Sequence, residues 1–155
     1  MINPTQYQQL VSASVRAAVM TIKVPGYTEE DLIHEGYLAI YRAEKSFDPS
    51  RGVKFETYAG RAIRNRIIDL ARKSGVTPTQ SQYEIDAHGE SLESEVERIQ
   101  LMERLQVALK TCTATEQAII ATYLKGQSYR EISEKLVIDA KKIDNTIQKV
   151  KKLVR

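Results

Sequence analysis

The sequence is poor in the residues that build disulfides and metal centres. Its 155 residues include one cysteine, Cys112, and two histidines, His34 and His88. A lone cysteine cannot form an internal disulfide, and three such residues scattered along the chain lack the spacing of a zinc site. We therefore expect no disulfide, no bound metal and no cofactor.

Long apolar runs are also missing. No stretch of eighteen apolar residues occurs, so we expect neither a membrane-spanning helix nor a membrane as a partner. Residues 1–10 lack the charged-then-apolar order of a signal peptide. The sequence therefore predicts a cytoplasmic protein, and its 42% of hydrophobic residues can form a core.

The motifs of common enzymes are absent as well. The chain has no glycine-rich phosphate loop, no nucleophile elbow and no set of metal ligands at catalytic spacing. We therefore expect a protein that binds other molecules, without catalytic residues.

Charge is unevenly distributed, although the net charge is only +3. Residues 42–73 contain nine Lys or Arg and four Asp or Glu, and residues 141–155 contain six basic residues and one acidic residue. Between these segments, residues 74–97 contain six acidic residues and no Lys or Arg. The pattern predicts two basic modules joined by an acidic connector.

Apolar residues recur at helical spacing along most of the chain, and strand patterns are nearly absent. We expect an all-α protein with helices over about residues 6–23, 54–72, 92–110, 128–136 and 139–154. Two further helices should begin at Thr28 and Thr113. Three capping boxes support these starts: Thr28 with Asp31, Thr113 with Glu116, and Ser128 with Glu131. The last helix should bury Ile143, Ile147, Val150 and Leu153.

The connector lacks this periodicity and is rich in Gly, Thr, Pro, Gln and Ser. We therefore predict two small helical domains, residues 1–73 and 96–155, joined by a flexible acidic linker over residues 74–95.

The end of the chain has the pattern of a helix-turn-helix unit, with a short turn at Val137-Ile138-Asp139. If the apolar stripe of the last helix faces inward, polar residues near its start face outward, where a DNA major groove could meet them. Candidates for base edges are Ala140, Lys141, Asp144, Asn145 and Gln148. Candidates for phosphates are Lys142, Lys149, Lys151 and Lys152. A solvated basic surface is the alternative, but the capped helix pair favours DNA binding.

A second candidate site lies where the helix over residues 54–72 begins. Phe55, Thr57 and Tyr58 precede three arginines, Arg61, Arg64 and Arg66. Rings can stack on bases while cations neutralise phosphates, which suits a single nucleic-acid strand. The alternative for Phe55 is ordinary core packing.

Two sets of motifs closely resemble the sigma-70 family of RNA polymerase sigma factors. Motifs like the family's core domain are Asp31-Leu32-Ile33-His34-Glu35-Gly36, Ala43-x-x-x-Phe47-Asp48-Pro49-x-x-Gly52-x-x-Phe55-x-Thr57-Tyr58-Ala59 and Ile63-Arg64. Motifs like the promoter-binding domain of its alternative, sporulation sigma-H-like members are Glu116-Gln117, Ser128-Tyr129-x-Glu131-Ile132 and Lys142-Ile143-Asp144-Asn145. The resemblance covers about residues 28–72 and 113–155.

This resemblance implies an alternative sigma factor, which directs core RNA polymerase to promoters and initiates transcription. The first domain would be sigma2-like, docking on the clamp helices of the largest polymerase subunit and recognising and melting the minus-10 element. The second domain would be sigma4-like, contacting the flap of the second-largest subunit and recognising the minus-35 element. An anti-sigma factor is a further candidate partner.

The resemblance also implies roles for individual residues. For polymerase docking they are Asp31, Leu32, Ile33, His34, Glu35 and Gly36. For the minus-10 element they are Phe47, Lys54, Phe55, Thr57, Tyr58, Arg61, Arg64 and Asn65. Tyr58 would stack on an adenine flipped from the non-template strand, in a pocket shaped by Phe47 and Phe55. For the minus-35 element they are Ala140, Lys141, Lys142, Asp144, Asn145, Gln148 and Lys149.

Some alternatives stay open at this point. Primary sigma factors carry two tryptophans where this chain has Arg61 and Ala62, which predicts weaker melting. The acidic connector could thread toward the polymerase active-site channel or be an ordinary solvated linker. An acidic helix start near Asp31 also complements the helix dipole without any docking role. The main rival function is a helix-turn-helix regulator or activator of a mobile element or phage, which would not need Tyr58 and its flanking phenylalanines.

Overall fold

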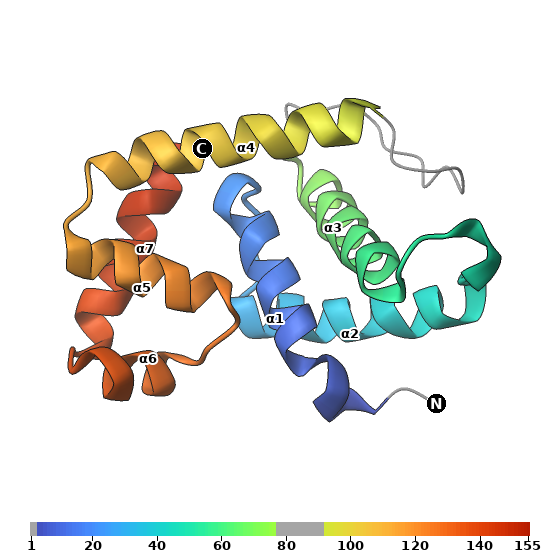
Figure 1. The fold of residues 1–155 in the computed structure, drawn as a ribbon, viewed down its shortest axis with the longest axis horizontal. Helices are drawn as coiled ribbons and strands as arrows, with labels where there is room; N and C mark the ends of the chain where they lie inside the picture. Colours follow the sequence, from blue (N-terminus) through green and yellow to red (C-terminus); the bar gives the residue numbers. More distant parts are fainter. Residues whose placement is uncertain (1–2, 77–91) are drawn as a thin grey trace. The chain divides into compact units, whose positions relative to one another are not determined.

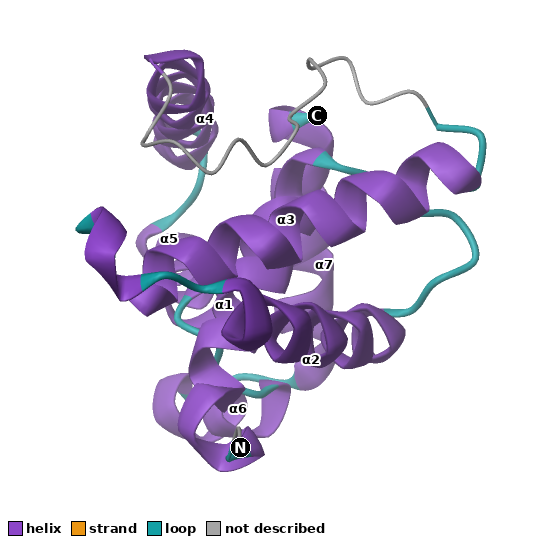
Figure 2. Cartoon of the chain, turned by 90° about the vertical axis from the view of Figure 1, so that its right-hand side faces the viewer, coloured by secondary structure: helices purple, strands orange, loops and turns teal. Residues whose placement is uncertain are grey.

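The computed structural model describes residues 3–76 and 92–155, and within these ranges every regular element is a helix (Figures 1 and 2). The elements are α1 (Pro4–Thr21), α2 (Glu29–Ser46), a 3-10 helix η1 (Pro49–Arg51), α3 (Phe55–Lys73), α4 (Leu92–Lys110), α5 (Ala114–Leu124), α6 (Tyr129–Leu136) and α7 (Ala140–Val154). The all-α prediction is confirmed for this part of the chain.

Contacts divide the chain into two compact units, Met1–Gly89 and Glu90–Arg155. Most of the segment predicted to be a linker, residues 77–91, lies outside the described residues, so the linker and the domain boundaries stay predictions. None of the helices in the described ranges is long and apolar enough to cross a membrane.

The first unit packs α1, α2 and α3 against one another around an aliphatic core. Val11 and Val15 of α1, Ile40 of α2 and Ile63 and Ile67 of α3 are fully buried. At their crossing α1 and α2 approach very closely, because a Cβ atom placed on Gly36 would lie 2.8 Å from Val11 Cγ1. A residue without a side chain is therefore required at that crossing.

The turn between α2 and α3 sets the relative direction of these two helices. Asp48 caps η1, since its Oδ1 accepts from the backbone N–H of Ser50 at 2.9 Å. Gly52 follows with a positive φ of 72°, a conformation that glycine adopts without strain. The turn residues of this segment, Asp48, Pro49 and Gly52, account for the change of direction. The turn brings Phe47, at the end of α2, toward Phe55, at the start of α3.

The second unit contains α4 to α7, with α5, α6 and α7 packed on one another. Its fully buried side chains include Ile119 and Tyr123 of α5, Ile132 of α6 and Ile143 and Ile147 of α7. All three predicted capping boxes are present, at the starts of α2, α5 and α6.

One predicted core residue is wrong. Leu153 is 51% exposed, whereas Val154 is 2% exposed and packs in the core. The buried stripe of α7 runs from Ile143 through Ile147 and Val150, and a step of four residues from Val150 leads to Val154. The prediction took a step of three residues from Val150 to Leu153, which lies outside the buried face.

Candidate nucleic-acid interface

The outer face of α7 carries all the residues predicted to meet the minus-35 element. All of them are exposed: Ala140, Lys141, Lys142, Asp144, Asn145, Gln148 and Lys149. The opposite face is fully buried at Ile143, Ile147 and Val150. The separation of a polar face from an apolar face, which the sequence predicted, is therefore present in the structure.

The junction before α7 is held by side chains. The Oδ1 atom of Asp139 accepts from the backbone N–H of Lys142 at 2.7 Å and caps the helix. The hydroxyl of Tyr129 donates to Asp144 Oδ1 at 3.2 Å, which links α6 to the outer face of α7. Ser133 Oγ donates to the carbonyl oxygen of Ile138 and closes the turn. These bonds fix the direction in which α7 leaves the turn.

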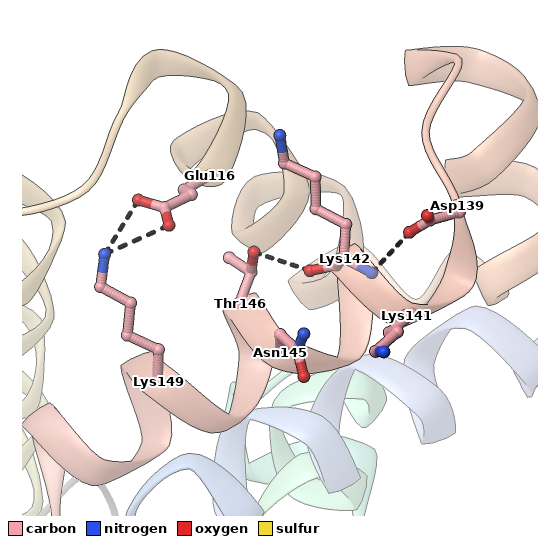
Figure 3. Close-up of a pocket in the computed structure, with 7 residues that line it drawn as sticks. All are labelled: Glu116, Asp139, Lys141, Lys142, Asn145, Thr146 and Lys149. Carbon is pink, nitrogen blue, oxygen red and sulfur yellow. Dashed lines mark hydrogen bonds and ion pairs between the residues drawn. The ribbon is translucent and has the colours of Figure 1, made fainter.

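An open hollow of about 320 Å³ lies along the first half of α7 (Figure 3). It is lined by Glu116, Asp139, Lys141, Lys142, Asn145, Thr146 and Lys149. Glu116 reaches across from α5, and its two carboxylate oxygens lie 3.2 and 3.1 Å from Lys149 Nζ. The backbone N–H of Thr113 and the ammonium of Lys149 together lower the pKa of Glu116. Glu116 therefore caps α5 and at the same time orients a lysine of α7.

The charges along α7 suit an anionic partner. Lys141 and Lys142 stand in the first turn, which contains no acidic residue. Cations at a helix N-terminus oppose the helix dipole and do not stabilise the helix. Asp139 already accepts from the N–H of Lys142 at this end, so the ammonium groups of the two lysines supply the attraction for phosphate.

A cluster of four aromatic rings lies at the start of α3 in the first unit. We call it the aromatic cluster, and its members are Tyr7, Phe47, Phe55 and Tyr58. The centroid of the Phe55 ring lies 5.5 Å from that of Tyr7 and 5.2 Å from that of Phe47, both edge-on. Phe47 also lies 5.5 Å from Tyr58 at an interplanar angle of 45°. The separations are those of favourable aromatic pairs.

Tyr7 was not among the sequence predictions. It precedes Val11 and Val15 by four and eight residues and so continues the buried stripe of α1. The spacing places it near the core, but only the tertiary structure shows that its ring meets Phe55.

The other residues predicted for the minus-10 element lie along α3. Lys54 is the residue before the helix and Thr57 stands in its first turn, and both are exposed. Farther along the helix, Arg61, Arg64 and Asn65 are partly buried. The structure therefore brings Phe47, Phe55 and Tyr58 together in one cluster and spreads the cations along the helix beyond it.

The residues predicted to dock on polymerase, at the start of α2, divide by burial. Leu32 and Gly36 are in the core, Ile33 and Glu35 are partly buried, and Asp31 and His34 are exposed. Several also have structural roles. Glu35 Oε2 accepts from Arg66 Nε at 2.7 Å, and Asp31 caps the helix, with its pKa lowered by the backbone N–H and hydroxyl of Thr28.

Two exposed apolar residues continue this surface along α2. Leu38 and Tyr41 are each 51% exposed, and they follow His34 by four and seven residues on the same helical face. The sequence predictions missed Leu38 and Tyr41. The signal that could have found them was the helical spacing of apolar residues outside the buried stripe of α2.

Comparisons with known proteins agree on one family. Residues 6–76 match the model for sigma-70 region 2. The RNA polymerase sigma-H factor of Bacillus licheniformis is 26% identical over an alignment covering 96% of this chain and 74% of that protein. The sigma-H factor of Bacillus subtilis is 25% identical, covering 96% of this chain and 76% of that protein.

A shorter and closer similarity involves the RNA polymerase sigma-D factor of Bacillus subtilis, which is 46% identical over 35% of this chain and 21% of that protein. No solved structure matches the chain with significance. The matched region, the relatives and the aligned extent agree with the residue motifs, and together they support a sigma-70 family RNA polymerase sigma factor.

Proposed function

We propose that this chain is an alternative sigma factor, which directs core RNA polymerase to specific promoters and initiates transcription. One observation carries the proposal: two sigma-H factors align with 96% of the chain and therefore with both of its units. In this role the chain acts in the cytoplasm, binds core polymerase and promoter DNA, and contributes no catalytic residue.

In this proposal the outer face of α7 enters the major groove of the minus-35 element. Asn145 and Gln148 carry exposed amides, which can pair with the donor and acceptor on the edge of an adenine. Lys141, Lys142 and Lys149 neutralise the phosphates on either side of the groove. The proposal is supported by the clear division of α7 into two faces and by the cations of its first turn.

The aromatic cluster is proposed to capture the minus-10 element once it has opened. Tyr58 stacks on an unpaired adenine of the non-template strand, and Phe47 and Phe55 hold its ring. Unstacking a base costs a few kcal/mol, whereas stacking on a protein ring returns about 1–3 kcal/mol per base. Phosphate contacts of the arginines along α3 supply the remainder.

The exposed part of α2 is proposed as the docking surface for the clamp helices of the largest polymerase subunit. Asp31, His34 and the partly buried Ile33 and Glu35 present side chains there, whereas Leu32 and Gly36 support the helix from the core. The α4–α7 unit is proposed to contact the flap of the second-largest subunit. An anti-sigma factor would compete for one of these surfaces.

The proposal is tested by transcription with purified core polymerase on a library of genomic fragments, with and without the chain. New start sites that share two spaced upstream elements are expected only when the chain is added. No new starts, and no binding to core, would contradict the proposal.

The same assay separates a sigma factor from an activator of a mobile element or phage. An activator stimulates polymerase that already contains another sigma factor and gives nothing with core alone. In addition, Tyr58→Ala should reduce initiation by a sigma factor, because opening depends on the aromatic cluster, whereas an activator should tolerate it.

A further inference from the structure

The hydroxyl of Tyr58 meets a serine at the end of α2. Tyr58 Oη lies 2.9 Å from Oγ of Ser46, the last residue of that helix. The two residues come from different helices, on either side of the turn that contains η1. Ser46 was not among the residues predicted for any site.

Ser46 also meets two backbone carbonyl groups at the end of α2. Its Oγ lies 3.2 Å from the carbonyl oxygen of Arg42 and 3.4 Å from that of Ala43. Carbonyl oxygens only accept, so a bond to either of them uses the single hydroxyl proton of Ser46. In the arrangement that satisfies these contacts together, Tyr58 is the donor in its bond to Ser46.

The Tyr58 ring is thus held at two places by consecutive residues. Phe47 lies against the ring at a centroid distance of 5.5 Å, and Ser46 holds its hydroxyl. A phenol that donates to Ser46 has no proton to donate to a base, although its oxygen can still accept. What Tyr58 offers a nucleic acid is therefore the face of an oriented ring, and stacking on a ring is tolerant of sequence.

We propose that Ser46 is a positioning residue, which orients Tyr58 for stacking on an unpaired base of the minus-10 element. The inference rests on the function proposed above, because it concerns the same ring. It goes beyond that function by adding a residue that touches no nucleic acid and by assigning the Tyr58 hydroxyl to Ser46. Selection among bases must then come from neighbouring side chains.

The test uses the full chain with core polymerase, on a promoter obtained from the start-site mapping. A fluorescent 2-aminopurine in the minus-10 element reports the rate of opening. Ser46→Ala and Tyr58→Phe should each slow opening by about three- to tenfold, the range expected for loss of one ordinary hydrogen bond. The double variant should be no slower than either single variant, because both remove the same bond.

Two further variants separate positioning from a general structural role. Ser46→Thr keeps a hydroxyl that can bond the helix carbonyls and should restore opening. Ser74→Ala is the matched control, since Ser74 Oγ also donates to a carbonyl at the end of a helix, that of Leu70 at 3.0 Å. Both alanine variants should bind core polymerase and unfold in urea like the unchanged chain, and only Ser46→Ala should open promoters slowly.

Failure of the inference about Ser46 can be distinguished from failure of the proposed function. If the unchanged chain directs initiation and Tyr58→Ala impairs it, but Ser46→Ala or Tyr58→Phe opens promoters at the normal rate, Ser46 does not position the ring and the inference is overturned alone. Additive effects in the double variant overturn it as well. If the unchanged chain gives no initiation with core, the proposed function fails and the inference fails with it.

Discussion

The two candidate interfaces differ in how far binding residues are separated from the residues that hold the fold. On α7 the residues predicted to meet the minus-35 element are all exposed, the further phosphate candidate Lys151 is partly buried, and the core residues occupy the other face. On α2 and at the start of α3, the same residues serve both purposes. Gly36 permits a close helix crossing, Glu35 pairs with Arg66, and Phe55 packs between two rings. Asp144 and Lys149 also bond to α6 and α5, so substitutions should act most cleanly at the other exposed positions of α7, such as Asn145, and with mixed effects on α2.

The largest expected effect is a loss of stability in the first unit. Gly36→Ala should lower its free energy of unfolding by about 1–3 kcal/mol, because the new methyl group would overlap Val11 in a tightly packed core. Urea unfolding measures this loss. Leu38→Ala is the control on the same helix, since its side chain is exposed and its removal should change stability by less than about 0.5 kcal/mol.

These two variants also distinguish an effect on binding to core polymerase from an effect on stability. Leu38→Ala should weaken binding to core polymerase while the unit stays folded, if the exposed surface of α2 is the docking site. Normal core binding by Leu38→Ala would remove that residue from the proposed surface.

On α7 the expected effect is on sequence preference alone. Asn145→Ala should relax selection at one base pair of the minus-35 element by about 1–3 kcal/mol of discrimination, with unfolding unchanged. Binding to a set of single-base promoter variants measures it. Lys152→Ala is the control, since loss of a phosphate contact should weaken every sequence alike and reduce the salt dependence. An unchanged preference in Asn145→Ala would exclude this residue as a reader.

A smaller effect is expected at the turn that precedes α7. Val137 has a positive φ of 55° and is 88% exposed, so a β-branched residue is held in a strained conformation without packing in return. Val137→Asn should stabilise the second unit by about 1 kcal/mol, because asparagine tolerates this region better. Val137→Ile keeps the branch and should leave the unfolding midpoint unchanged. A loss of stability in Val137→Asn would show that the strain argument is wrong.

The smallest expected effects are on how the stability of each unit depends on pH. The folded-state pKa values of Asp31 and Glu116 are lowered by the helix caps they form. Each carboxylate therefore adds stability above its unfolded pKa and loses it as the pH falls through the folded pKa. Asp31→Asn should make the first unit less sensitive to acid, and Glu116→Gln should do so for the second, with Glu30→Gln as an exposed control. Urea unfolding at neutral and acidic pH measures the difference.

Local signals were sufficient to predict most of the helices. The capping boxes at Thr28, Thr113 and Ser128 fix three helix starts through short-range hydrogen bonds, and the turn before Gly52 follows from its own composition. Contacts between helices were not predictable in this way. Tyr7 reaches Phe55, Ser46 reaches Tyr58 and Glu116 reaches Lys149 only because tertiary packing brings residues together that are distant in sequence.

The error at Leu153 has a similar cause. Steps of three and four residues both fit a helical stripe, and the neighbouring helices decide which of the two is buried. The candidate residues of α7 were easier to predict, because a helix with one apolar stripe leaves only one outward face.

The measurement that tests the account most directly is permanganate reactivity of promoter DNA with core polymerase and the chain. Thymines of the minus-10 element should become reactive only when both proteins are present, and Tyr58→Ala should reduce that reactivity while the complex still forms. A promoter that stays closed although core and the chain are both bound would contradict the account and favour an activator.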